Sequence, residues 1–136
     1  MGAVAPREAI PARLYLVICS LGVAMPAIAL AAAPAVDGEA LYRNKCGGCH
    51  SVEANRTGPR HRGVVGRRVA SVPGYDYSPA LRQLGGQWTP ARLDAWLSDT
   101  QKMAPGSKMY LALDDVSQRR LIIEYLQSVS GPGSAK

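Results

Sequence analysis

The pattern of hydrophobic and polar positions divides the chain into two parts. Residues 14–33 form an apolar run without a charged residue, and the segment before it carries Arg7, Glu8 and Arg13. The run ends in small residues, which is typical of a cleavable secretory signal. A run of 20 residues is also long enough to span a bilayer, so an uncleaved membrane anchor is the alternative. We therefore expect residues 1–33 to be a signal peptide or anchor and residues 34–136 to form one folded domain.

Within the second part, three segments have apolar residues at helical spacing. The first covers residues 38–47. The second starts at Thr89 and Pro90, an N-cap followed by a first-turn proline. The third follows possible capping acceptors at Asp114, Asp115 and Ser117, and its apolar face comprises Leu121, Ile122, Tyr125, Leu126 and Val129. The pattern predicts an all-α domain with three main helices.

Residues 51–87, between the first two predicted helices, show no element of their own. A loop of this length is unusual in a compact domain. The composition also indicates that side chains alone do not fill the core, since the chain is 47% hydrophobic but only 6% aromatic and contains no Phe. We expect a non-protein group to complete the core, with the long loop wrapped around this group.

Two cysteines of the second part stand in the sequence Cys46-Gly47-Gly48-Cys49-His50. A structural zinc site needs four ligands, and besides His50 the chain has only one other histidine, His61, and no cysteine after Cys49. A thioredoxin-like dithiol belongs in a βαβ context, whereas the residues before Cys46 are predicted to be helical. The spacing Cys-x-x-Cys-His is instead typical of c-type haem attachment, in which two thiols capture one porphyrin and the histidine faces the iron. We therefore predict one covalently attached haem c with iron, bound through Cys46 and Cys49, with His50 as one axial ligand.

The chain from residue 38 to 125 resembles the class I, mitochondrial-type cytochromes c. The resemblance rests on motifs that occur in the same order as in that family: Gly38-x-x-x-Tyr42, Thr57-Gly58-Pro59, Gly63-x-x-Gly66-Arg67, Pro73-Gly74-Tyr75-x-Tyr77, Trp88, Pro105-Gly106-Ser107-Lys108-Met109 and Tyr125. It implies the cytochrome c fold, in which three main helices and long loops surround one covalent haem.

The resemblance also implies the second axial ligand. Met109 follows the segment that delivers the distal methionine in the family, and a Met/His pair raises the reduction potential and leaves no open position for oxygen. The rivals are Met103, which we expect to fill a gap in the core, and His61, which we expect to be a surface or partly buried histidine.

The family further suggests which residues surround the haem. The Pro59 carbonyl is expected to accept the His50 N–H, and Ser107 replaces a family threonine. Arg67, Tyr77 and Trp88 are expected to contact the haem propionates, although a solvated arginine and plain core aromatics are the alternatives. The chain departs from the family at several positions near the haem, namely Leu81, Trp96, Thr100, Leu111 and His61, the last in place of a leucine packed on the haem.

These features predict a monohaem electron carrier of the bacterial periplasm, not an enzyme, that shuttles single electrons between a membrane reductase and a terminal acceptor such as an oxidase. The net charge of +6 favours membrane redox complexes with acidic docking surfaces, and we expect a monomer. Nucleic acid is not expected to be a partner, since no binding module is visible. Two alternatives stay open: a haem enzyme or gas sensor with an open distal site, and a tethered subunit of a larger complex that residues 14–33 anchor to the inner membrane, facing the periplasm.

Overall fold

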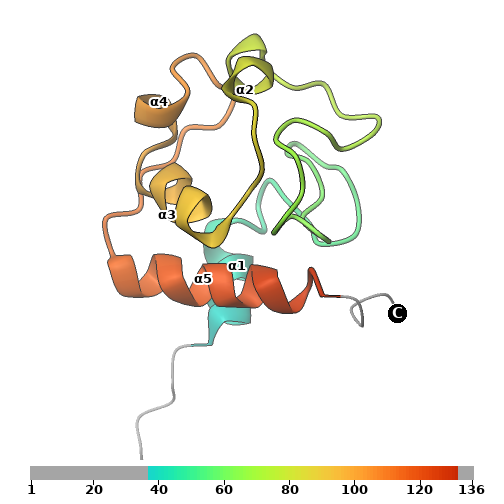
Figure 1. Cartoon of the computed structure of the whole chain (residues 1–136). Helices are drawn as coiled ribbons and strands as arrows, with labels where there is room; N and C mark the ends of the chain where they lie inside the picture. Colours follow the sequence, from blue (N-terminus) through green and yellow to red (C-terminus); the bar gives the residue numbers. More distant parts are fainter. Residues whose placement is uncertain (1–36, 132–136) are drawn as a thin grey trace, which may run out of the picture. The chain divides into compact units, whose positions relative to one another are not determined.

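The computed structural model describes residues 37–131, which form helices joined by long loops (Figure 1). Within this range there is no β-strand, and one isolated antiparallel bridge joins Arg68 to Gln87. The predicted all-α fold is therefore confirmed. The predicted signal peptide or anchor at residues 1–33 lies outside the described residues.

The three predicted helices are present, and the second and third have the expected caps. Helix α1 spans Gly38–Lys45, and the Asp37 side chain accepts the N–H of Glu39 at its start. Helix α3 spans Pro90–Ser98 with Thr89 as N-cap, and helix α5 spans Val116–Ser128 with Asp115 as N-cap. Each cap supplies a side-chain acceptor to a backbone N–H that has no partner inside the helix.

Two short helices correct the sequence-based description. Helix α2, Pro79–Leu84, lies inside the segment that was expected to have no element of its own. The Ser78 hydroxyl accepts the N–H of Leu81 at 3.3 Å and Pro79 occupies the first turn, which is the same combination as Thr89 and Pro90. Helix α4, Thr100–Met103, directly follows α3, with Asp99 as its N-cap. The long loop therefore carries one helix of its own.

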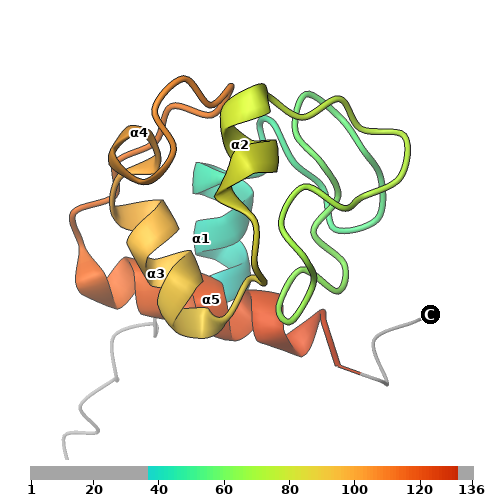
Figure 2. The ribbon, with the colours of Figure 1, turned by 45° about the horizontal axis from the view of Figure 1, so that its top comes forward.

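Helices α1 and α5 are far apart in the sequence but pack against each other, and α3 packs against α5 (Figures 1 and 2). Gly38 permits the first contact, because a Cβ on this residue would collide with the Leu121 carbonyl and lie 3.2 Å from the Cβ of Tyr125. The Tyr42 and Tyr125 rings also meet, with centroids 5.1 Å apart. The core beneath these helices includes the buried side chains of Leu41, Leu97, Ile122, Ile123 and Leu126.

The described residues contain no helix whose length and apolarity would let it cross a bilayer.

Candidate functional site

A cavity of about 350 Å³ lies between the helices and the long loop. Every residue that the sequence singled out for haem attachment, iron ligation or haem contact lines this cavity: Cys46, Cys49, His50, Pro59, Arg67, Tyr77, Trp88, Ser107 and Met109. Apolar side chains complete the walls, among them Leu81, Leu93, Leu97, Ile122 and Leu126. The structure thus brings together residues from segments that are far apart in the sequence.

The two thiols lie at the end of α1, where the helix gives way to a tight turn. The Cys46 N–H donates to the Tyr42 carbonyl at 2.8 Å, and the N–H groups of Cys49 and His50 donate to the Cys46 carbonyl at 3.1 and 2.9 Å. Cys46 is buried and Cys49 is exposed. Burial, with a smaller contribution from Cys49, raises the pKa of the Cys46 thiol to about 11. The turn therefore presents two thiols, one at the wall and one at the edge of the same cavity.

The imidazole of His50 is buried and held in one orientation. Its Nδ1 lies 2.8 Å from the Pro59 carbonyl oxygen. Because a carbonyl only accepts, Nδ1 carries the proton and Nε2 has a lone pair, which is the tautomer that binds a metal through Nε2. Burial lowers the pKa of His50, which favours this neutral form, while the Pro59 hydrogen bond acts in the opposite direction. Gly58 completes the setting, since a Cβ at this position would collide with the His50 ring.

His61 is partly buried and lies beside His50 in the cavity wall. The two imidazole rings are stacked, with centroids 4.1 Å apart. The Nδ1 of His61 lies 3.2 Å from the Tyr42 hydroxyl, and burial lowers the pKa of His61 well below its ordinary value, with His50 and Arg67 acting in the same direction. His61 is therefore a partly buried histidine that packs against the His50 ring.

Met109 and Met103 differ in position. Met109 lines the cavity, whereas Met103, at the end of α4, is absent from the cavity lining and packs against the hydrophobic core. The Ser107 side chain, only 1% exposed, lies 3.1 Å from the Met109 carbonyl oxygen through its Oγ. Of the two methionines in the described part of the chain, Met109 is the one that lines the cavity.

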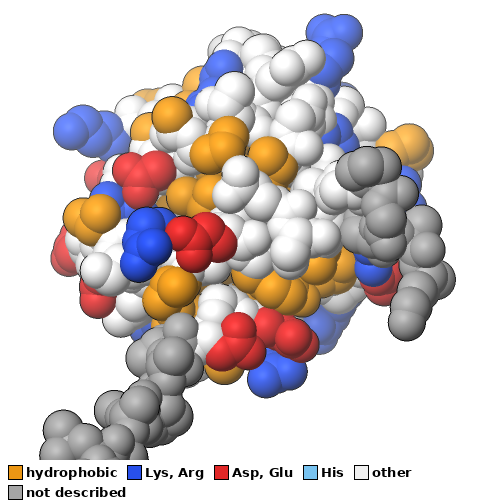
Figure 3. All heavy atoms as spheres, turned by 60° about the horizontal axis from the view of Figure 1, so that its bottom comes forward, with side chains coloured by type: hydrophobic (Ala, Val, Ile, Leu, Met, Phe, Trp, Pro, Cys, Tyr) orange, Lys and Arg blue, Asp and Glu red, His pale blue; other side chains and the backbone are white. Residues whose placement is uncertain are grey.

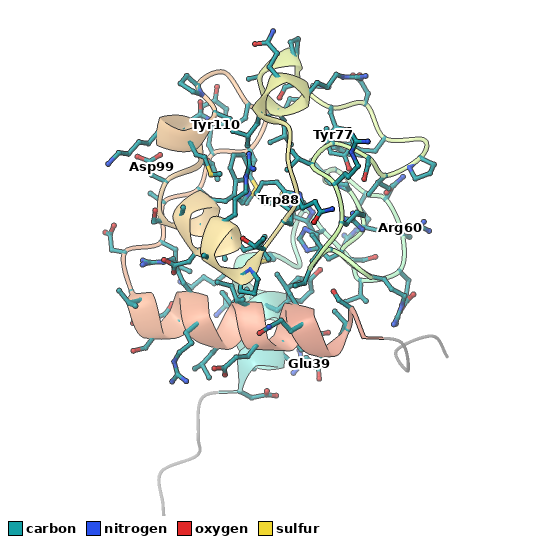
Figure 4. The ribbon with its side chains drawn as sticks, viewed as in Figure 1. Glu39, Arg60, Tyr77, Trp88, Asp99 and Tyr110 are labelled. Carbon is teal, nitrogen blue, oxygen red and sulfur yellow. The ribbon has the colours of Figure 1, made fainter. Side chains whose placement is uncertain are left out.

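Side chains with polar groups also line the cavity, among them Tyr77 and Trp88, which are labelled in Figure 4. The Arg67 guanidinium donates to the carbonyls of Arg60 and Arg62, both at 2.9 Å, so it is not simply solvated. The Tyr77 hydroxyl accepts the Val72 N–H at 3.2 Å, and Trp88 is buried near the middle of the molecule. Contact of these groups with haem propionates stays a prediction, consistent with their place in the cavity wall.

The donor set fits a covalently attached haem. Two thiols one turn apart match two vinyl groups, a neutral imidazole with its lone pair at Nε2 matches one axial position of iron, and a thioether matches the other. Gly58 leaves room for the His50 ring, so the fold itself determines where the ring lies. A guanidinium in the wall offers charge to the carboxylates of the porphyrin edge.

Comparisons with known proteins agree with this geometry. Residues 35–130 match the family model described as Cytochrome c. Cytochrome c2 of Rhodopila globiformis is 39% identical over 97 residues, which cover 69% of this chain and 92% of that protein. Cytochrome cH from Methylobacterium extorquens, a solved structure, superposes with a TM-score of 0.64 at 38% identity and covers 67% of this chain and 94% of its own.

The cytochrome c-type cyt cy of Rhodobacter capsulatus is 37% identical over 94 residues, or 68% of this chain. The matched region spans 47% of the length of that relative. The similarity therefore concerns the domain that carries the cavity.

Proposed function

Because the chain belongs to the cytochrome c family, a family of electron carriers with one covalently attached haem c, we propose that it is an exported carrier that shuttles electrons between a membrane reductase and a terminal acceptor such as an oxidase. When bound, the haem supplies one-electron chemistry, since its iron alternates between Fe(II) and Fe(III). The carrier makes and breaks no substrate bond.

The residues of the cavity have distinct roles in this proposal. Cys46 and Cys49 attach the porphyrin through their sulfur atoms. His50 would hold the iron through Nε2, with Pro59 keeping the proton on Nδ1, and Met109 would supply the second protein ligand. Arg67, Tyr77, Trp88 and Ser107, which line the same cavity, would contact the porphyrin.

One observation carries the proposal: two thiols, an oriented imidazole and a thioether line the same cavity. An enzyme or gas sensor would need an open iron position. In our proposal Met109, which lines the same cavity, supplies the thioether that closes this position.

The edge of the cavity suggests where a partner docks. Lys45, Lys108 and Tyr110 line the cavity and are all exposed, Tyr110 by 78%. A basic edge beside the haem suits brief contact with an acidic surface of a membrane complex. By contrast, the face seen in Figure 3 carries acidic, basic and hydrophobic side chains intermixed, without a patch of one sign.

The location follows from the expectation for residues 1–33. We propose that they direct export to the periplasm and that the carrier acts there as a monomer. Mass spectrometry of the mature N-terminus tests this: a start near residue 34 supports the diffusing carrier, whereas retention of residues 14–33 shows that the protein is anchored to the membrane.

Haem attachment is tested by mass spectrometry of peptides from the protein expressed in cells that attach haem c. We expect the peptide containing Cys46 and Cys49 to carry the mass of one haem, and the double variant Cys46→Ser, Cys49→Ser to carry none. An unmodified peptide from the coloured wild-type protein would refute covalent attachment at this motif.

Iron ligation is tested by optical spectroscopy of Met109→Ala beside the matched control Met103→Ala. We expect Met109→Ala to lose the weak red absorption of sulfur-bound ferric iron and to bind carbon monoxide when reduced, and Met103→Ala to do neither. If the reduced wild-type protein binds carbon monoxide as readily as Met109→Ala, the carrier assignment is wrong.

A further inference from the structure

The backbone carbonyl of Met109 is surrounded by side-chain donors. The Thr100 Oγ1 lies 2.8 Å from this oxygen, and the Gln101 Nε2 lies 2.7 Å from it. The Ser107 Oγ is the third neighbour, at 3.1 Å. A carbonyl oxygen normally has one or two partners, so this is an unusually complete set of contacts for one loop residue.

Thr100 connects α4 to Met109 and to Leu111, which follows it by two residues. Its backbone N–H donates to the Leu111 carbonyl at 3.0 Å, and its Oγ1 accepts the Leu111 N–H at 3.0 Å. Thr100 is fully buried, so no water competes for these bonds. The segment from Met109 to Leu111 is therefore pinned to the first residue of α4.

Gln101 connects α4 to the loop before Met109. Its Oε1 accepts the Gly106 N–H at 3.1 Å, and its Nε2 lies 2.9 Å from the Ser107 Oγ and 3.1 Å from the Ser107 carbonyl. The amide oxygen thus faces a donor and the amide nitrogen faces acceptors, as the chemistry of the group requires. One side chain spans the loop from Gly106 to Met109.

The start of α4, which carries both side chains, is itself fixed. The Asp99 Oδ1 accepts the N–H groups of Gln101 and Lys102, both at 3.0 Å. These two cap bonds hold the first turn of α4 in place. Thr100 and Gln101 therefore approach the Met109 carbonyl from a short but well-anchored element.

We propose that Thr100 and Gln101 are positioning residues that hold the Met109 thioether against the haem iron. The inference rests on the proposed function, in which Met109 is the distal ligand. A thioether is a neutral and weak ligand, so the strength of its bond depends on how little freedom the chain loses when the bond forms. Hydrogen bonds that fix the Met109 backbone in advance remove much of that freedom.

The test measures how readily an added ligand displaces Met109. Free imidazole competes for the distal position of the ferric protein, and its association constant reports how firmly Met109 is held. Thr100→Val removes the hydroxyl and keeps the shape of the side chain, and Gln101→Met removes the amide and keeps its length. We expect each variant to bind imidazole roughly three- to tenfold more tightly than wild type, the range that one net hydrogen bond provides.

Three controls separate positioning from general stability. Thr100→Ser keeps the hydroxyl and is expected to restore near-wild-type imidazole affinity. Gln83→Met makes the same chemical change on the exposed face of α2, and Ile123→Val weakens the core away from the cavity lining. We expect Ile123→Val to lower the denaturant midpoint of unfolding. Neither Gln83→Met nor Ile123→Val is expected to change the imidazole affinity.

The outcomes are distinct. Wild-type imidazole affinity in both Thr100→Val and Gln101→Met, with the red absorption intact, overturns the positioning role and leaves the proposed function standing. If the wild type and Met109→Ala have the same spectrum, Met109 is not the ligand and both proposals fail. Gln101 is only partly buried, so Gln101→Met decides the matter should Thr100→Val not accumulate as holoprotein.

Discussion

The imidazole of His61 lies stacked on that of His50, with ring centroids 4.1 Å apart and an interplanar angle of 18°. The Tyr42 hydroxyl lies 3.2 Å from the His61 Nδ1, and this contact holds the His61 ring in place. His50 is thus fixed twice, at its edge by the Pro59 carbonyl and on its face by His61. The residue at position 61, where the family has a leucine, acts on the orientation of the proposed iron ligand.

This stack predicts an effect on the electronic structure of the ferric protein. His61→Leu removes the aromatic face, so the His50 ring gains rotational freedom about its bond to iron. We expect the NMR shifts of the haem methyl groups, which report the plane of the axial imidazole, to change their order or spread. Tyr42→Phe is expected to shift them in the same direction by less. Methyl shifts in His61→Leu that match those of wild type would refute the role of the stack.

The close approach of Gly58 to His50 predicts that replacing this glycine lowers the stability of the protein. Gly58→Ala places a Cβ into the imidazole ring, which forces the ring or the loop to move at a cost of about 1–3 kcal/mol in unfolding free energy. Gly48→Ala is the matched control, because a Cβ there meets nothing within 4 Å. Denaturant titration of both holoproteins measures the difference. Equal stability of the two variants would contradict this reading.

The buried guanidinium of Arg119 predicts a large loss of stability on substitution. It donates to the Asp94 carboxylate at 2.7 Å and to the carbonyls of Leu113 and Asp114 at 2.7 and 3.0 Å. Arg119→Met leaves these acceptors without their donor, and we expect a loss of roughly 2–4 kcal/mol in denaturant unfolding. Arg120→Met, which breaks an exposed pair with Glu124, is expected to cost less than about 0.5 kcal/mol. Similar losses for the two variants would be inconsistent with a special role of burial.

The contact between Asp76 and Lys108 predicts a pH dependence in the acid range. The hydrogen bond and charge of Lys108, assisted by Arg82, hold the pKa of Asp76 below its ordinary value of 3.8. Because the folded state favours the carboxylate, this contribution to stability is fully present above pH 3.8 and is lost as the pH falls through the lower pKa of the folded protein.

An NMR titration of the Asp76 carboxyl carbon checks this directly. We expect Lys108→Met to raise the pKa of Asp76 toward 3.8, while Lys102→Met leaves it unchanged. A pKa of 3.8 or above in the wild-type protein would show that the two side chains do not form the contact in solution.

The sequence predicted those features that depend on neighbouring residues. The Cys-x-x-Cys-His spacing, the helical spacing of α1 and the capped starts of α3 and α5 are local patterns, and the structure has the helices where they were expected. Helix α2 carried the same signal at Ser78 and Pro79, but its six residues are too few to show a periodic apolar face.

The features that escaped prediction depend on contacts between distant residues. His61 meets Tyr42 across 19 positions, and Thr100 reaches Met109 across nine, so neither contact leaves a pattern in the nearby sequence. In the sequence, Thr100 stood out only as a departure from the family, and His61 as a departure and as a rival axial ligand. In the structure, the side chains of both residues lie at hydrogen-bond distance from residues that are distant in the sequence.

The pairing of α1 with α5 has a consequence for the order of events when the protein is made. Helix α1 can pack against α5 only after the final segment of the domain has been made and exported. The domain therefore cannot complete its fold while synthesis or translocation is still under way. Throughout that interval the Cys46 sulfur, which the finished domain shields, remains accessible. Any machinery that must reach this atom therefore works on a chain that has not yet folded.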